Sequence, residues 1–250
     1  MTRPKGSLIL LLLLFVVLFG LRFIHLGADP PDDWTRTSLG YMSDPGGYAH
    51  NSRNQVLFGS WEVDNWNRMY ASIVPHIPNY VIFALFGSGV AQMNAVPALF
   101  SCLLLVFVFL ILLRTYNRTF ALLGTALLGA NYIFTVFSQV AVRAMPMMFF
   151  VILALYFLNR RDYPEKLDLF LAGAMCFLAF MSKGTLLHVL PAVFLGAVVF
   201  VYFQYSARLR PAISSGLFFL LGFLVVLGIW LLLIYLPHIE DFQDFAASNL

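Results

Sequence analysis

Charged residues are scarce in this sequence. Only 11% of its 250 residues are Asp, Glu, Lys or Arg, whereas 61% are hydrophobic and the mean hydropathy is +0.84. An ordinary soluble domain carries about 25% charged residues, so the composition excludes that class. The apolar residues come in unbroken runs, which are typical of spanning helices and not of membrane barrels. We therefore predict an all-α integral membrane protein.

Cysteine is almost absent as well. Cys102 and Cys176 are the only two, and each lies inside an apolar run, so nothing supports a disulfide framework or a thiolate metal site. The basic residues form no dense patch, which argues against a nucleic-acid partner. No second histidine lies at metal-ligand spacing from His50. The expected partners include membrane lipids and no nucleic acid.

Seven apolar runs predict a single transmembrane domain of seven spans. Several runs are shorter than the roughly 20 residues that a span needs, so these spans extend into flanking polar residues or lie partly at the interface. The first run follows a basic N-terminus without a cleavage site and is interpreted as an uncleaved signal anchor. The predicted spans are residues 7–23, 96–113, 120–137, 147–158, 167–181, 186–205 and 213–236.

Basic residues in the short connections predict the orientation, because cytoplasmic loops are enriched in Lys and Arg. With the N-terminus inside, nine of the 15 basic residues are cytoplasmic: Arg3, Lys5, Arg114, Arg118, Arg160, Arg161, Lys166, Arg208 and Arg210. Nine of the 12 acidic residues are then outside: Asp29, Asp32, Asp33, Asp44, Glu62, Asp64, Glu240, Asp241 and Asp244. We expect a multi-pass protein of the bacterial inner membrane with a cytoplasmic N-terminus.

The segment 25–94 then faces the periplasm, and several prolines interrupt it. Within it we predict two interfacial helices, residues 48–58 before Gly59 and residues 78–86 before Gly87, because glycine commonly follows the last helical residue.

The most polar part of this segment is SDPGGYAHNSRNQVLFGSWEVDNWN, residues 43–67. Helical spacing places His50 and Arg53 on one face near Asp44, so that an acid, a base and a cation converge. The alternative is that Asp44 and Pro45 simply begin a helix, with the Asp as N-cap.

Arg143 and Lys183 break the positive-inside pattern, since both lie at outer ends of predicted spans. Ionisable groups there are candidates for function, and paired cations suit a phosphate or pyrophosphate. The alternative is that both side chains snorkel to lipid headgroups. The polar residues around Trp66, namely Asp64, Asn65 and Asn67, either bind sugar hydroxyls or form a solvated turn.

Residues 43–67, followed by PHIPNY and FALFG, are similar to the first outer loop of GT-C type membrane glycosyltransferases, which include the protein O-mannosyltransferases and aminoarabinose transferases. Two later stretches agree. FSQVAVRAMPMMFFVILALYFL resembles the family's motif at the outer end of a helix, and LAGAMCFLAFMSKGTLLHVLP resembles its glycine-rich span with a Lys-Gly turn.

The resemblance implies inverting transfer of a sugar from a polyprenyl-phosphate donor to a lipid, glycan or protein acceptor at the outer face. Asp44 takes the place of the motif aspartate that acts as general base, and cations stabilise the departing phosphate. The expected substrate-binding residues are Tyr48, His50, Asn51, Arg53, Asp64, Arg143 and Lys183. No metal ligand is predicted, and a divalent metal ion stays open as a cofactor.

Two positions differ from the family's pattern. Pro45 stands where a glutamate follows the motif aspartate, and Ala144 stands where a second acid often precedes Met-Pro. The chain is also short for the family, which implies the N-terminal half of a longer member. A non-catalytic or split relative acting as a scaffold is therefore one alternative, and a transporter of lipid-linked sugars is another. Transporters usually place charged sites near mid-membrane, unlike the arrangement predicted here.

Overall fold

A computed structural model describes residues 5–28, 44–63, 69, 72–160, 165–183, 195–196, 199 and 209–248. No strand occurs among these residues, in agreement with the predicted all-α class. The α-helices are α1 (Lys5–Phe23), α2 (Asp44–Phe58), α3 (His76–Phe86), α4 (Val90–Thr115), α5 (Arg118–Ala130), α6 (Tyr132–Ser138), α7 (Ala144–Asn159), α8 (Lys166–Ser182), α10 (Leu209–Trp230) and α11 (Ile239–Ser248). A π-helical turn, η3 (Leu231–Tyr235), and a 3₁₀ turn, η4 (Leu236–His238), join α10 to α11.

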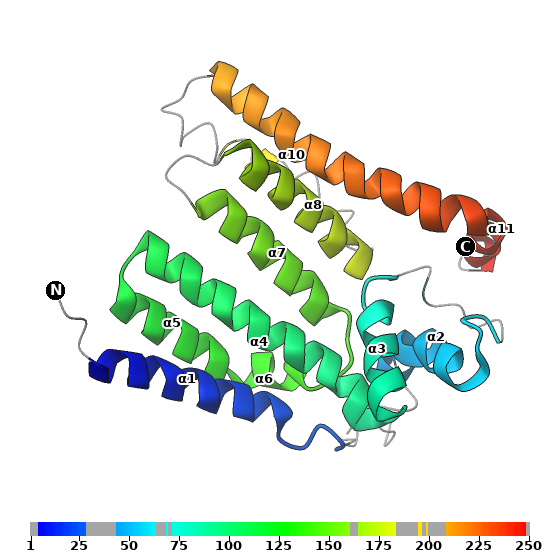
Figure 1. The fold of residues 1–250 in the computed structure, drawn as a ribbon, viewed down its shortest axis with the longest axis horizontal. Helices are drawn as coiled ribbons and strands as arrows, with labels where there is room; N and C mark the ends of the chain where they lie inside the picture. Colours follow the sequence, from blue (N-terminus) through cyan, green and yellow to red (C-terminus); the bar gives the residue numbers. More distant parts are fainter. Residues whose placement is uncertain are drawn as a thin grey trace.

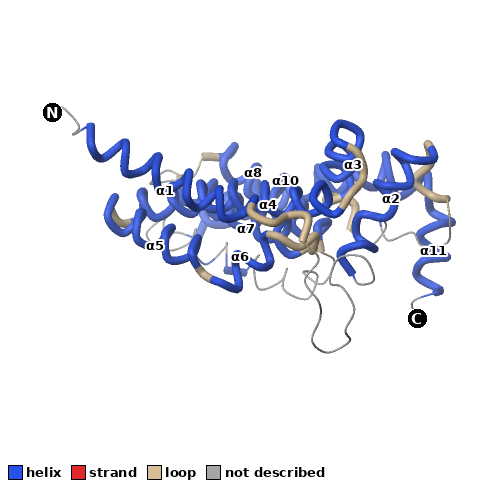
Figure 2. The backbone as a smooth tube through the Cα atoms, turned by 90° about the horizontal axis from the view of Figure 1, so that it is seen from below, coloured by secondary structure: helices blue, strands red, loops and turns tan. Residues whose placement is uncertain are grey.

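The long helices lie side by side in one layer, in the order α1, α5, α4, α7, α8 and α10 (Figure 1). Figure 2 shows this layer edge-on, with α11 running across it. Helices α2, α3 and α11 gather at one end, which we call the α3 end; α1 and α8 finish there, and α4 and α7 begin there. At the other end α4 and α7 finish and α8 begins. We call it the basic end, because it carries Arg114, Arg118, Arg160 and Lys166.

Two described helices are long and apolar enough to cross a membrane, Val90–Thr115 and Ile213–Asp244, with 26 and 32 residues. They contain the predicted spans 96–113 and 213–236. A third is obtained if α5 and α6, which meet at 65°, form one broken span.

The other predicted spans are not established by helix length. Helices α1, α7 and α8 coincide with the predicted spans 7–23, 147–158 and 167–181, but they are not among the two long spanning helices. The predicted span 186–205 falls almost entirely outside the described residues.

The predicted span 120–137 is broken in two at Asn131. This residue leaves the helical conformation at ψ 128°, and its side chain caps α6 by accepting from the backbone N–H of Phe134 at 3.0 Å. The break exposes the carbonyl of Gly129, which accepts from the guanidinium of Arg22 at 2.5 Å. Arg22 is fully buried and lies 5.1 Å from the centre of the Phe134 ring. A side chain of α1 therefore replaces water at the break, as an apolar surrounding requires.

Both predicted helices of the segment 25–94 are present, and each ends where glycine predicts. Helix α2 finishes before Gly59 and α3 before Gly87, and these glycines have φ values of 74° and 82°, in the left-handed region that favours glycine. The starts differ from the prediction, because α2 begins at Asp44 and α3 at His76. The interpretation of Asp44 and Pro45 as a helix start is therefore correct for the backbone.

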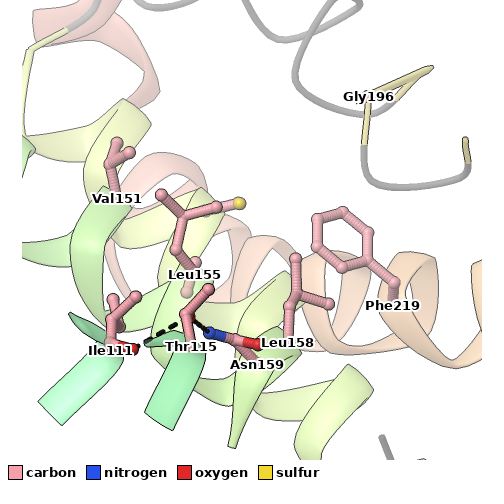
Figure 3. Close-up of a pocket in the computed structure, with 10 residues that line it drawn as sticks. Ile111, Thr115, Val151, Leu155, Leu158, Asn159, Gly196 and Phe219 are labelled. Atoms are coloured by element: carbon pink, nitrogen blue, oxygen red, sulfur yellow. Dashed lines mark hydrogen bonds between the residues drawn. The ribbon is translucent and has the colours of Figure 1, made fainter. Parts of the chain in front are cut away.

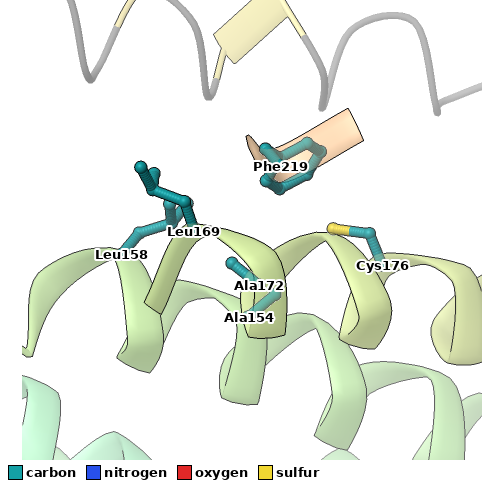
Figure 4. Packing of buried hydrophobic residues seen from close by; sticks show 6 residues of the cluster. All are labelled: Ala154, Leu158, Leu169, Ala172, Cys176 and Phe219. Carbon is teal, nitrogen blue, oxygen red and sulfur yellow. The ribbon is translucent and has the colours of Figure 1, made fainter. Parts of the chain in front are cut away.

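Helices α8 and α10 pack through glycine. A Cβ atom on Gly173 would lie 1.8 Å from the carbonyl oxygen of Phe219, and one on Gly222 would lie 1.9 Å from that of Phe170. Small residues at such crossings let two backbones approach closely in a membrane. Beside the crossing, a core cluster holds α7, α8 and α10 together (Figure 4): Ala154, Leu158, Leu169, Ala172, Cys176 and Phe219.

We expect Gly173→Ala to destabilise the protein by about 1–3 kcal/mol, the usual cost of overpacking, because the added methyl group clashes with backbone that cannot rotate away. Gly228→Ala is the matched control, since a Cβ there meets nothing within 4 Å. Thermal unfolding of both variants in the same detergent tests this, and equal midpoints would contradict the close crossing.

Candidate functional site

The predicted site residues of helix α2 lie at the α3 end. The helix opens with Asp44, Pro45 and two glycines, and proline is favoured in a first turn because its missing N–H needs no partner. Tyr48 lies one turn after Asp44, so the two residues share a face of α2. The backbone of Asp44 is described, whereas its side chain lies outside the described part.

Tyr48 and Arg143 are in direct contact. Arg143 directly precedes the first residue of α7, and its Nη2 atom donates to the hydroxyl oxygen of Tyr48 at 3.1 Å. Its Cζ atom also lies 4.1 Å from the centre of the Tyr48 ring. Stacking on a ring together with a hydrogen bond fixes the plane of a guanidinium. The fold thus joins two predicted site residues that are 95 positions apart in the sequence.

Asn94, which is buried near the start of α4, anchors the segment that precedes Arg143. The side chain of Asn94 donates to the carbonyl of Leu26 at 2.9 Å and accepts from the backbone N–H of Ala141 at 3.0 Å. One side-chain amide therefore links the residues that follow α1 to the segment just before α7. This bond sets the position of the backbone that carries Arg143.

The α3 end also buries a set of polar side chains, which we call the polar cluster: Asn51, Ser52, Asn54, Ser72, His76, Asn79 and Asn94. Within it, the hydroxyl of Ser52 donates to the carbonyl of His76 at 2.9 Å, and its oxygen lies 3.1 Å from Nδ1 of the same residue. Asn54 donates to Nε2 of His50 at 3.1 Å. These bonds of the polar cluster hold α2 against the start of α3 and orient the imidazole of His50.

His76 is a neutral residue at physiological pH. Burial lowers its pKa to about 3, and the charge of Arg143 and the nearby His50 ring act in the same direction. Because the Ser52 hydroxyl donates to a carbonyl, its oxygen can accept a hydrogen bond from the Nδ1–H group of a neutral His76 ring. His76, His50 and Arg143 therefore share one neighbourhood.

Asn51 holds the chain that follows α2. It is fully buried, donates to the carbonyl of Trp61 at 2.8 Å and accepts from the backbone N–H of Met69 at 3.3 Å. The ring of Trp61 in turn lies 5.4 Å from that of Tyr80 on α3. Binding of substrate by Asn51 stays a prediction, and the contacts shown give it a structural role.

Lys183 lies at the same end of the helical layer as Arg143, the α3 end. It follows the last residue of α8, and its backbone N–H donates to the carbonyls of Phe180 and Ala179 at 3.1 and 3.3 Å. The preceding carbonyl, that of Ser182, accepts from the hydroxyl of Ser72 in the segment that leads into α3. This bond sets Lys183 beside the same segment that supplies His76.

The remaining predicted site residues are Arg53 and Asp64. Arg53 is exposed on α2, and Asp64 lies outside the described residues. Near Asp64 in the chain, burial and the carboxylate of Asp241 raise the pKa of Glu62, while His238 lowers it. The chain after α2 therefore runs close to the start of α11. Among the described residues, no three His, Cys, Asp or Glu side chains gather closely enough to hold a metal ion.

Sequence reasoning missed His76, Ser52 and Asn94. The signal for His76 was present in PHIPNY, where His76 and Asn79 stand three residues apart in an otherwise apolar stretch and therefore face the same side of a helix. Ser52 and Asn94 carry no comparable signal, because polar residues of these types are common at helix starts.

We expect the stability of the protein to fall as the pH drops from about 6.5 towards 3, in part because the unfolded chain binds a proton at His76 that the folded chain excludes. The slope due to this group is about 1.4 kcal/mol per pH unit. His76→Gln, which keeps a donor for Ser52, removes that part of the slope. Unfolding of both proteins between pH 7 and pH 4 measures it, and parallel curves would overturn the assignment.

Three comparisons with known proteins bear on the family of the chain. A search of curated proteins and a search of solved structures found no significant match. A family profile described as dolichyl-phosphate-mannose-protein mannosyltransferase matches residues 77–235, more than half of the chain, from α3 to the end of the π-helical turn. The chain therefore belongs to the dolichyl-phosphate-mannose-protein mannosyltransferase family, a group of GT-C type membrane glycosyltransferases.

Proposed function

We propose that this protein transfers a sugar from a polyprenyl-phosphate donor to an acceptor hydroxyl at the α3 end of the helical layer. The observation that carries the proposal is the contact between Arg143 and Tyr48. It orients a guanidinium beside the helix that begins with Asp44. The family of the chain supports the reaction class, and the site residues and the donor are our inference.

Asp44 is the proposed general base. Its backbone precedes that of Tyr48 by one helical turn of α2, a rise of about 6 Å. Its place in the first turn of α2 also favours the ionised form, because a helix N-terminus stabilises a negative charge. A carboxylate there can take the proton of an attacking hydroxyl.

The chemical step is a single displacement at the anomeric carbon. The acceptor oxygen forms the new bond to this carbon while the bond from the carbon to the phosphate oxygen breaks, and the phosphate leaves with the electron pair. The hydroxyl proton passes to the carboxylate of Asp44. Arg143 and Lys183 stabilise the negative charge on the departing phosphate. Attack opposite the leaving group inverts the sugar carbon.

His50, Asn51, Arg53 and Asp64 are proposed to contribute to sugar binding, with the ring of His50 oriented by Asn54. We further propose seven spans, a cytoplasmic N-terminus and a periplasmic α3 end in a bacterial inner membrane. The grouping of Arg114, Arg118, Arg160 and Lys166 at the opposite end supports this orientation, since cytoplasmic ends are basic.

A second candidate is a non-catalytic or split relative. Its motivation is the absence of two carboxylates: Pro45 lies in the first turn of α2, and Ala144 is the first residue of α7, directly after Arg143. Both positions lie beside the proposed site. A chain that binds the lipid-linked sugar without transferring it would therefore fit this candidate.

We expect Asp44→Asn to reduce sugar transfer by at least about 100-fold, the low end of the contribution of a general base. Asp244→Asn is the control, because Asp244 is an exposed carboxylate on α11. The measurement is transfer of radiolabel from a polyprenyl-phosphate sugar to membrane acceptors. Equal transfer by both variants would exclude Asp44 as the base, and no transfer by the wild type would favour the non-catalytic candidate.

Arg143→Lys is expected to lower kcat by about 10²-fold, comparable to the loss of one donor to a developing anion, because an ammonium cannot keep both the stack and the hydrogen bond to Tyr48. Tyr48→Phe keeps the stack and loses the bond, so we expect a smaller loss, about tenfold or less. Steady-state kinetics of the two variants test this order, and a larger loss for Tyr48→Phe would contradict it.

A further inference from the structure

The basic end contains a cavity that the proposed reaction does not use. Its volume is about 590 Å³, within the range of small-molecule sites. The cavity lies between α4, α7, α8 and α10 (Figure 3). Much of its wall is formed by Ile111, Val151, Leu155, Leu158, Cys176 and Phe219. It is therefore formed from the second halves of α4 and α7, away from the α3 end.

The polar groups of this wall satisfy one another. The amide of Asn159 donates to Oγ1 of Thr115 at 2.7 Å, and this hydroxyl donates to the carbonyl of Ile111 at 2.9 Å (Figure 3). A water molecule needs two to four polar partners to occupy a cavity, and apolar cavities stay dry or bind apolar groups. The other described lining residues offer hydrocarbon, the thiol of Cys176 and the glycine Gly196. The chemistry of the cavity therefore suits a hydrocarbon chain.

Basic residues lie next to lining residues of the cavity at the basic end. Arg114 precedes the lining residue Thr115, and Arg160 follows the lining residue Asn159. The ammonium of Lys166 lies 5.1 Å from the centre of the Phe218 ring, next to Phe219 in the wall. Arg160 also pairs with the buried carboxylate of Asp168 at 3.4 Å and remains 35% exposed. An apolar cavity with a basic rim complements a molecule that has a hydrocarbon tail and an anionic head.

We propose that this cavity binds one acyl chain of an anionic phospholipid, whose phosphate lies against Arg114 and Arg160. Basic sites between membrane helices select anionic headgroups by charge. An acyl chain that fills the space between α4, α7 and α10 makes dispersion contacts that an empty cavity lacks. The lipid is then held in the leaflet opposite to the proposed transfer site. This binding does not depend on the proposed transferase activity.

The experiment is photocrosslinking of the full-length protein in nanodiscs. One probe is phosphatidylglycerol with a diazirine in its acyl chain, and the other is phosphatidylcholine with the same chain. We expect the first probe to label peptides that contain Leu155 and Cys176, with excess unlabelled phosphatidylglycerol competing. Leu155→Trp fills the cavity from a residue that is 48% exposed, so labelling falls about tenfold, which corresponds to ~1.4 kcal/mol of binding.

Leu127→Trp is the matched control, because Leu127 is 75% exposed on α5 and does not line the cavity. If Leu155→Trp elutes as an unfolded protein, Val151→Trp and the competition experiment on the wild type take its place. Arg114→Gln is expected to remove the preference for phosphatidylglycerol. The proposal is overturned if labelling maps outside the cavity, if filling the cavity leaves it unchanged, or if both lipids label the wild type equally.

Discussion

Helix ends in an apolar surrounding need partners for their backbone groups, and at the α3 end side chains of other helices supply them. Arg22 of α1 donates to the carbonyl of Gly129, which the break after α5 exposes. Gln139 donates to the carbonyls of Leu21 and Ile24 at 2.7 and 3.0 Å, and Asn94 joins the end of α1 to the segment before α7. Because an unsatisfied carbonyl costs several kcal/mol where water is absent, these bonds decide where each helix stops.

The same requirement produces the candidate site. The bond of Ser72 to the last carbonyl of α8 brings the segment before α3 onto the layer, and the pair of Ser52 and His76 brings α2 onto α3. Helix α2 then presents Tyr48 to Arg143. Several hydrogen bonds connect this polar cluster, and such bonds make it rigid. The oriented guanidinium is thus a product of how the loop is anchored, and catalysis by positioned charge needs that rigidity.

The two ends of the molecule differ in chemistry. The α3 end buries hydrogen-bonded polar side chains and carries the proposed transfer site, whereas the basic end has an apolar cavity surrounded by arginine and lysine. Tight helix packing connects the two ends, since Gly173 and Gly222 bring α8 and α10 into backbone contact between them. A lipid in the cavity and a sugar donor at the α3 end would therefore bind to the same rigid helices.

Local signals were enough to predict the helical class, the helix ends at Gly59 and Gly87, and the location of Arg143 and Lys183 at the same end of the helical layer. Apolar run length, the left-handed preference of glycine and the alternation of helix direction are properties of short segments. The break at Asn131, the burial of His76 and the contact of Arg143 with Tyr48 depended on the tertiary structure. Each of them requires a partner from a distant part of the chain, and no local pattern specifies which polar group will meet which when the helices pack.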